Sequence, residues 1–311
     1  MSISDLSRAV LVFSATLATL AGCGGRGNNS LASSPPGGLA SLPATSRKLY
    51  VANSTTVTVY SPPKTGLKRT ISHSGAPLRD RDGSWMLPEA RTTKELLYIS
   101  DATTEHVYVY NYLTRRLLGR LDGLYQPSGQ CVDASGNIWI ADSMAEAVVE
   151  YTHGTVRYSN RLRTLGRPNG CSVDPTSGSL AVSIGLTKRG TSTIEVFDLT
   201  GRHNVYAGSE CQKIQQVGYD NHGNLYVAAA SLDFSAAVCE LPHGGSHLVE
   251  VQVSQNISEV SGVMWDGKYI TFTDEDYHGA SAIYQMKPTK SGGLDIVAQP
   301  SSAVAVTTIR R

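Results

Sequence analysis

A short apolar run returns six times along this chain, and no other feature limits its fold as strongly. Each copy reads as a β-strand, as in residues 49–53 (LYVAN) and 138–142 (IWIAD). Periods of this size, with several strands in each unit, are typical of propeller blades. The copies begin at Leu49, Leu97, Ile138, Leu180, Leu225 and Ile270, so successive starts lie 41 to 48 residues apart.

A second strand follows each of these runs, with apolar or aromatic residues at its first and last positions. The six copies span residues 57–60, 107–110, 148–151, 194–197, 238–241 and 283–286. Turn residues such as Gly244 and Gly245 come next, and residues 248–253 read as a further, outer strand. No segment with helical periodicity competes with this pattern. The sequence therefore predicts an all-β fold, a six-bladed β-propeller over residues 47–311.

Tight turns with a shared chemistry precede several of the runs. Asp133, Asp174, Asp220 and Asp266 each begin a turn that contains a glycine, as in residues 133–137 (DASGN). An aspartate at the start of a turn accepts backbone N–H bonds, and the glycine supplies the positive φ. We therefore interpret these carboxylates as turn caps rather than as catalytic groups.

The first repeat lacks an inner strand, because the polar segment before it runs directly into Leu49. A late apolar run, residues 303–309 (AVAVTTI), belongs to no repeat of its own. We predict that this run pairs with the first repeat and supplies the missing strand. Closing the ring in this way would remove two exposed sheet edges.

The N-terminus carries a processing signal. Arg8 is followed by a short apolar stretch, residues 9–20, that is too short to span a bilayer comfortably. Residues 20–23 (LAGC) resemble the bacterial lipobox, in which the cysteine is acylated and becomes the first residue of the mature protein. This resemblance implies a signal peptide over residues 1–22, a lipidated Cys23 and an exported protein. The alternatives are an ordinary signal peptide and a membrane-anchored start.

The lipidated segment at residues 23–46 continues beyond Cys23 with many Gly, Ser, Pro and Asn residues. Such a composition cannot bury a core, so we expect a flexible tether. Gly24, rather than Asp, follows the cysteine, and by analogy with lipoprotein sorting in Gram-negative bacteria this favours the outer membrane. The expected location is the cell envelope, with the propeller attached to the membrane through its lipid alone.

The charge balance excludes some classes of partner. The chain has 27 Lys and Arg residues and 26 Asp and Glu residues, which gives a formal net charge of +1. No cluster of basic residues stands out, so we expect neither nucleic acid nor an anionic membrane surface as a partner. The oligomeric state stays open.

Two further resemblances concern the repeats. Residues 126–142 resemble NHL-type repeats, and the six-repeat layout is similar to NHL proteins and to the gluconolactonase and regucalcin-like superfamily. Residues 168–170 (PNG) look like the segment of gluconolactonase-like enzymes in which the asparagine, here Asn169, coordinates a divalent metal. Those enzymes also need a Glu and an Asp on other inner strands, and the matching positions here have neither. Glu89 and Glu259 are candidate substitutes, and the alternative is that Asn169 forms an inter-blade turn.

Propellers bind ligands at the mouth of the central channel, on the loops that lead into the inner strands. Counting back from the turns places several polar residues there, and the acidic loop of the sixth repeat adds more. The candidate ligand-binding residues are Glu89, Gln130, Asn169, Gln216, Glu259, Asp274 and Asp276. Asp101, Asp142 and Asp274 end equivalent strands, where they either form an acidic rim or cap the following turns.

The cysteines beyond Cys23 are Cys131, Cys171, Cys211 and Cys239. Disulfides persist in exported proteins, and four cysteines allow three sets of pairs. Because Cys171 lies at a channel-mouth position and Cys211 in the loop into the next blade, we favour a disulfide between these two that joins adjacent blades. Cys131 and Cys239 are then interpreted as buried free thiols. No spacing of Cys and His indicates zinc.

The sequence shows no complete catalytic motif, neither HExxH nor GxSxG. We therefore favour a binding or scaffold module for a protein, peptide or glycan in the cell envelope, without catalytic residues or a cofactor. The alternative is a metal-dependent hydrolase or lactonase of the gluconolactonase-like type. Its divalent metal, held by Asn169 and acidic partners, would polarise a carbonyl and orient water.

Overall fold

A computed structural model of the chain describes residues 49–52, 56–61, 64–72, 83–94, 96–112, 114–209, 211–230, 235–254, 257, 260–275, 281–289, 292–301 and 306–308. Contacts divide the chain into two units, Met1–Ser46 and Arg47–Arg311. The expected signal peptide, Cys23 and the tether lie outside the described residues. Within the described ranges, no helix has the length and apolar character needed to cross a membrane.

The described strands form six four-stranded antiparallel sheets, which we number along the chain, with strands given from the innermost outward. Sheet 1 consists of β24 (Val306–Thr308), β1 (Leu49–Ala52), β2 (Thr56–Ser61) and β3 (Lys64–Ser72). Sheet 2 consists of β5 (Leu96–Asp101), β6 (His106–Asn111), β7 (Leu117–Leu121) and β4 (Trp85–Met86). Sheet 3 consists of β8 (Pro127–Val132), β9 (Ile138–Asp142), β10 (Ala147–Tyr151) and β11 (Tyr158–Arg163).

The later sheets follow the same order. Sheet 4 consists of β12 (Gly166–Val173), β13 (Leu180–Thr187), β14 (Thr193–Phe197) and β15 (His203–Tyr206). Sheet 5 consists of β16 (Lys213–Tyr219), β17 (Leu225–Ala230), β18 (Ala236–Leu241) and β19 (Val249–Glu250). Sheet 6 consists of β20 (Val260–Trp265), β21 (Ile270–Glu275), β22 (Ser281–Pro288) and β23 (Leu294–Ser301). The expected all-β propeller fold is confirmed.

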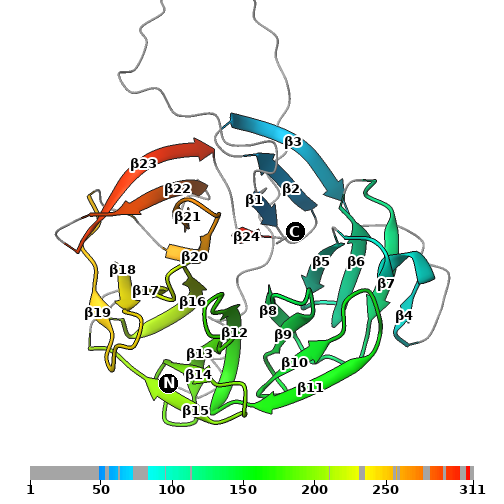
Figure 1. Cartoon of the computed structure of the whole chain (residues 1–311), viewed down its shortest axis with the longest axis horizontal. Coiled ribbons are helices and arrows are strands. Elements are labelled where there is room, and N and C mark those ends of the chain that lie inside the picture. Colours follow the sequence, from blue (N-terminus) through cyan, green and yellow to red (C-terminus); the bar gives the residue numbers. More distant parts are fainter. Residues whose placement is uncertain are drawn as a thin grey trace, which may run out of the picture. The chain divides into compact units, whose positions relative to one another are not determined.

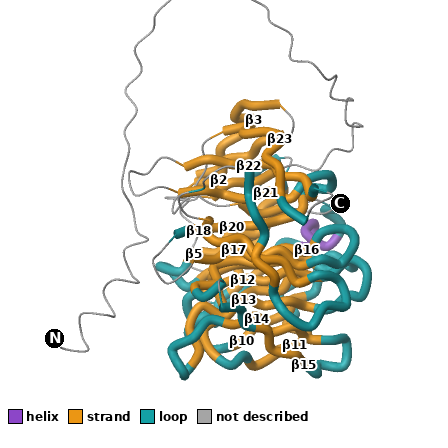
Figure 2. Tube along the Cα trace, turned by 90° about the vertical axis from the view of Figure 1, so that its left-hand side faces the viewer, coloured by secondary structure: helices purple, strands orange, loops and turns teal. Residues whose placement is uncertain are grey.

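Within the unit Arg47–Arg311, the sheets are arranged around a common centre (Figure 1). The innermost strands of successive sheets contact one another: β24 with β20, β20 with β16, β16 with β12, β12 with β8, and β8 with β5. A view turned by 90° shows loops on either side of the strands (Figure 2). The loops at one of these two ends therefore come from several sheets at once.

Sheets 3, 4 and 5 bury both faces against their neighbours, which explains the continuous apolar runs in this part of the sequence. Every residue of β9 and of β17 is buried. Ile140 and Val149 of sheet 3 pack in one cluster with Val107 and Val109 of sheet 2. Burying one such side chain contributes about 1.5–3 kcal/mol. The packing between sheets is therefore the main stabilising term of the ring.

The aspartate turns form as expected. Asp133 Oδ1 accepts the N–H groups of Ser135 at 2.8 Å and Asn137 at 2.9 Å, and Gly136 adopts a φ of 84°. Equivalent bonds are accepted by Asp174, Asp220 and Asp266. The interpretation of these carboxylates as turn caps is confirmed.

The predicted closing strand is also present. β24 pairs antiparallel with β1, with Leu49 opposite Thr308 and Val51 opposite Val306. β24 is the innermost strand of sheet 1, the position that the first repeat leaves empty. The remainder of the predicted run, residues 303–305 and 309, lies outside the described residues.

Sheet 2 departs from the pattern, because no described strand lies inside β5. The residues expected there form a 3-10 helix, η1 (Pro88–Arg91), ahead of β5. Pro88 has no N–H to donate to a sheet, and its fixed φ favours the first turn of a helix. Glu89 Oε2 pairs with Arg116 Nη1 at 2.8 Å, and both side chains are exposed. Glu89 therefore does not lie on an inner strand at the channel mouth, which corrects the sequence-based expectation.

A side chain from sheet 3 partly replaces the missing strand. Gln130 on β8 donates from Nε2 to the carbonyl oxygen of Tyr98 on β5, at 2.6 Å. The hydroxyl of Ser100, also on β5, donates to Gln130 Oε1. The Gln130 side-chain amide thus bonds to the edge of β5, where the missing inner strand of sheet 2 would have paired.

Two disulfides are present, and neither is the predicted one. Cys131–Cys171 joins β8 to β12 with a Cα–Cα distance of 5.5 Å, and Cys211–Cys239 joins the segment before β16 to β18 with 6.3 Å. Both distances lie in the usual range for disulfides. The expected Cys171–Cys211 bond, with Cys131 and Cys239 as free thiols, is wrong. Cys131 lies opposite Trp139 of β9 and Cys171 lies opposite Val182 of β13, one position further from the aspartate turn. Because successive side chains of a strand point to opposite faces, this offset lets the two cysteines face each other from neighbouring inner strands.

Candidate functional site

The inner strands of sheets 3 to 6 all begin at the same end of the ring, because each sheet repeats the same antiparallel order. We call this end the upper face and the opposite end the lower face. The upper face carries the loops that lead into the inner strands and the turns between the second and third strands. The lower face carries the aspartate turns.

Four large apolar side chains are exposed on the upper face over sheets 3 and 4. They are Tyr125 (60% exposed), Met144 (47%), Leu165 (47%) and Leu186 (52%). Tyr125 and Leu165 lie just before β8 and β12, Met144 lies in the β9–β10 turn, and Leu186 lies near the end of β13. We call these four residues the upper apolar patch.

Backbone contacts connect the loops that carry the patch. The Met144 N–H donates to the Tyr125 carbonyl oxygen at 3.0 Å. The Thr164 N–H donates to the Glu146 carbonyl oxygen at 2.9 Å, which joins the β9–β10 turn to the loop that holds Leu165. Single exposed apolar residues are normal on protein surfaces, whereas grouped ones mark sites of interaction.

A buried carboxyl holds the first of these loops. Asp142 is 1% exposed, and its Oδ1 accepts the Tyr125 N–H at 2.6 Å. Burial raises the pKa of Asp142, and the bond from Tyr125 opposes this only in part. Its other oxygen, Oδ2, is buried and makes no hydrogen bond within the described residues. Asp142 therefore neither forms an acidic rim nor caps the following turn; it fixes the loop that carries Tyr125.

A second buried carboxyl holds the next loop in the same way. Glu195 on β14 is fully buried, and its Oε1 accepts the Leu165 N–H at 2.7 Å. Burial raises the pKa of Glu195, while the Leu165 N–H and the neighbouring His203 act in the opposite direction. His203 Nε2 lies 3.5 Å from Glu195 Oε2. Two residues of the patch are thus positioned by buried acids underneath them.

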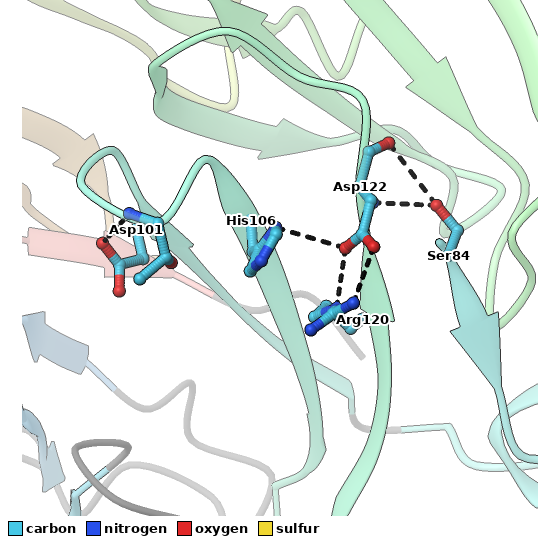
Figure 3. Close-up of polar contacts among 6 residues, drawn as sticks. Ser84, Asp101, His106, Arg120 and Asp122 are labelled. Atoms are coloured by element: carbon cyan, nitrogen blue, oxygen red, sulfur yellow. Dashed lines mark hydrogen bonds and ion pairs between the residues drawn. The ribbon is translucent and has the colours of Figure 1, made fainter. Parts of the chain in front are cut away.

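A polar network lies beside the patch on sheet 2 (Figure 3). Arg120 contacts Asp122 at two points, with Nε–Oδ1 at 2.7 Å and Nη2–Oδ2 at 2.8 Å. His106 Nδ1 lies 3.2 Å from Asp122 Oδ1. The Ser84 hydroxyl oxygen accepts the Asp122 backbone N–H at 2.8 Å. The serine thus contacts the Asp122 backbone and not the imidazole, so the serine–base bond of a hydrolase triad is not formed here.

Asp101 lies apart from that network in Figure 3 and caps its own turn. Its Oδ1 accepts the N–H groups of Thr103 at 2.9 Å and Thr104 at 3.1 Å. Of the two alternatives for Asp101, the structure shows the turn cap.

The inner strands line a small opening of about 80 Å³ that extends from mid-channel toward the lower face. Its lining comes from β8, β12, β16 and β20 and includes Gln130, Cys171, Gln216, Tyr219 and Trp265. No described residue of this lining is charged. Two predicted candidates, Gln130 and Gln216, therefore do reach the channel, in a wall of amides, aromatic rings and a disulfide.

Side-chain amides on the inner strands form hydrogen bonds between neighbouring sheets. Asn169 Nδ2 donates to the Ile214 carbonyl oxygen, and Gln216 Nε2 donates to the Asn169 carbonyl oxygen, both at 3.2 Å. Within the described ranges, no three His, Cys, Asp or Glu residues are grouped so as to hold a metal ion. The residues placed around Asn169 therefore do not fit the ligand set that the gluconolactonase resemblance implies, and Asn169 serves as a contact between sheets 4 and 5.

The three remaining candidates lie wholly or partly outside the described residues. Glu259 and Asp276 lie outside the described residues, and Asp274 is described only as a backbone position of β21. The upper apolar patch was missed by sequence reasoning, which searched for polar ligands. A signal was present, since Tyr125 and Leu165 lie shortly before two prolines, Pro127 at the start of β8 and Pro168 within β12.

No family model matches the sequence, and no curated protein matches it. A chain of the nidogen/laminin complex is similar in structure, with a TM-score of 0.63 and 14% identity over 84% of this chain and 98% of that chain. Hydrazine synthase from Kuenenia stuttgartiensis has a TM-score of 0.59 and 15% identity over 85% of this chain and 92% of its own. At such identities the similarity shows the fold alone, and by fold this chain is a β-propeller protein.

Proposed function

We propose that this propeller is a protein-binding module and that its partner docks on the upper face over sheets 3 and 4. The observation that carries the proposal is the upper apolar patch. Tyr, Leu and Met side chains exposed at one end of the ring leave apolar area in water, and covering that area stabilises a complex. Tyr125 is suited to an anchoring role, because its ring is large and loses few rotatable bonds on binding.

The rigidity of the site supports the same proposal. The loops that carry Tyr125 and Leu165 are tied by buried carboxyls, and the Cys131–Cys171 bond joins their two sheets. A preorganised surface loses less entropy on association than a mobile one. The nidogen/laminin complex adds an example in which a chain of this fold takes part in a protein complex. Fold alone does not determine function, so the patch remains the main support.

We further propose that the propeller acts in the cell envelope as an exported lipoprotein anchored through Cys23. The support is the lipobox-like segment at residues 20–23 and the two disulfides, which form in oxidising compartments. Replacing Cys23 with Ala should release the protein from the membrane fraction and abolish labelling with radioactive palmitate. Unchanged fractionation of the Cys23→Ala variant would contradict the anchor.

The binding proposal is tested with a photo-crosslinking residue at position 165 or 186 of the full chain, expressed in its own cells. A discrete crosslinked protein is expected at both positions. Leu199 is the matched control, because it is 81% exposed but lies on the lower face, in the turn between Asp198 and Arg202. Equal crosslinking at position 199, or no crosslink at either upper position, would contradict docking on the upper face.

No observation on the described residues favours the metal-dependent hydrolase. It would require carboxylate ligands for a metal near Asn169, and the hydrogen-bond partners found there are the Ile214 carbonyl oxygen and the Gln216 side-chain amide of sheet 5.

A further inference from the structure

Exposed cations border the upper apolar patch. Arg163 ends β11, opposite Ala147 at the upper end of β10. Arg167 pairs across β12 and β13 with Leu186, a member of the patch. Lys188 and Arg189 occupy the turn that follows β13. Four cationic side chains therefore lie among or beside the exposed apolar ones on sheets 3 and 4.

Most of these cations have no acidic partner. Lys188 Nζ lies 3.5 Å from Glu146 Oε2, an ion pair with both side chains in contact with water. In the described part of the chain, no ion pair involves Arg163, Arg167 or Arg189. An exposed ion pair contributes less than about 1 kcal/mol, so Lys188 also remains available to another carboxylate.

Apart from Glu146, which pairs with Lys188, several acidic residues of sheets 3 and 4 lie below or away from this surface. Asp142 and Glu195 are buried and hold the loops of the patch. Asp133, Asp174 and Asp198 accept the N–H groups of lower-face turns. The upper face over these sheets is therefore locally positive, although the whole chain has a formal net charge of only +1.

We infer that the partner presents an acidic polypeptide segment whose Asp and Glu residues are interleaved with apolar side chains. This inference rests on the proposed function and adds the chemistry of its partner. Apolar side chains of the segment would cover Tyr125, Met144, Leu165 and Leu186, while its carboxylates would meet Arg163, Arg167 and Arg189. Arginine suits this role, because its planar guanidinium binds a carboxylate through two parallel hydrogen bonds.

The position of Glu146 favours a polypeptide over an anionic bilayer or a phosphate backbone. Its carboxylate lies at the edge of the patch and is partly exposed. Glu146 would repel a continuous anionic surface. A peptide carries its charges at discrete positions, so it can place a hydrogen-bond donor opposite the Glu146 carboxylate. Steering by the three unpaired arginines would also make association faster at low salt than at high salt.

The test selects short random peptides displayed on phage against the full-length chain in detergent. Peptides enriched in Asp or Glu together with Leu, Phe or Tyr are expected. Their affinity should fall at least about tenfold for the Arg163→Glu/Arg167→Glu variant, and their binding should weaken as salt is raised. Arg202→Glu on the lower-face turn is the matched charge control and should leave affinity unchanged. Circular dichroism and melting temperature establish that each variant is folded.

The outcomes separate this inference from the function on which it rests. If the selected peptides are neutral or basic and do not bind the Leu165→Asp variant, the upper-face site is supported. The inference of an acidic partner is then wrong. Peptides that bind equally well to Leu165→Asp and to the arginine variant would overturn both. Binding to phosphatidylcholine vesicles that requires phosphatidylglycerol and is lost in the arginine variant would also overturn the inference, because the partner would then be a lipid surface.

Discussion

Removing the Cys131–Cys171 bond tests how sheets 3 and 4 are held together. The bond closes a loop with a sequence separation of 40 residues between the innermost strands of the two sheets. A cross-link of that length removes about 13 cal/mol/K of entropy from the unfolded chain, equivalent to about 3.9 kcal/mol at room temperature. Since domains are typically stable by roughly 5–15 kcal/mol, this one bond supplies a substantial share of the total.

The perturbation is the double variant Cys131→Ala/Cys171→Ala. Alanine is chosen because Cys171 is buried, and serine would place a hydroxyl in that space. The free energy of unfolding, measured by urea titration of oxidised protein, should fall by about 3–4 kcal/mol. The melting temperature should fall by roughly 6–16 °C, at about 2–4 °C for each kcal/mol.

Two controls separate the cross-link from the loss of sulfur atoms. Wild-type protein reduced with dithiothreitol loses both disulfides without any change of side chain, so its free energy of unfolding should fall by roughly the combined losses of the two double variants. The variant Cys211→Ala/Cys239→Ala removes a bond with a separation of 28 residues, for which the same relation gives about 3.6 kcal/mol. The reasoning is refuted if the first variant loses less than about 1 kcal/mol, or if peptide mapping of the oxidised protein finds Cys171 joined to Cys211.

Three further changes probe the site and the ring. Asp142→Asn should raise stability at neutral pH by about 1 kcal/mol, since the amide still accepts the Tyr125 N–H and no charge is buried. Burial raises the folded-state pKa of Asp142, so wild-type stability should fall as pH rises through that pKa, and urea titrations at several pH values should show a weaker fall in the variant. Gly129→Ala should cost about 1–3 kcal/mol, because a Cβ there would lie 2.7 Å from the backbone of Asn169 and Gly170; an unchanged melting temperature would contradict this close approach. Asn169→Ala should lower stability by about 1 kcal/mol and leave the metal content of the purified protein unchanged; loss of a stoichiometric metal would instead support the hydrolase.

The fold could be predicted because its causes are local and repeated. The buried strands show as apolar runs, and the Asp and Gly turns mark where each inner strand ends. The repeat length also pointed to the correct disulfide. Cys131 and Cys171 are separated by 40 residues, which is close to the length of one repeat. The pairing from expected loop positions overlooked that residues one register position apart on neighbouring inner strands face each other.

The site was harder to predict for a physical reason. Its members are single apolar residues in loops, and exposure of a Leu or Met depends on which sheets cover the loop. The roles of Asp142 and Glu195 depend on contacts with Tyr125 and Leu165, which lie 17 and 30 residues away in sequence. Pro88 permits the helical turn in sheet 2 but does not determine it, because the matching prolines of the next two repeats, Pro127 and Pro168, lie in strands β8 and β12.

The pairing of Leu49 with Thr308 has a consequence for the biosynthesis of the chain. Translation delivers about 5–20 residues per second, so β1 is made well before β24 can reach it. Until then the inner side of β1 is an open strand edge, which can pair with another nascent chain. A chaperone that covers residues 49–52 should therefore be needed until translation has passed residue 308, and its depletion should cause the newly made protein to aggregate.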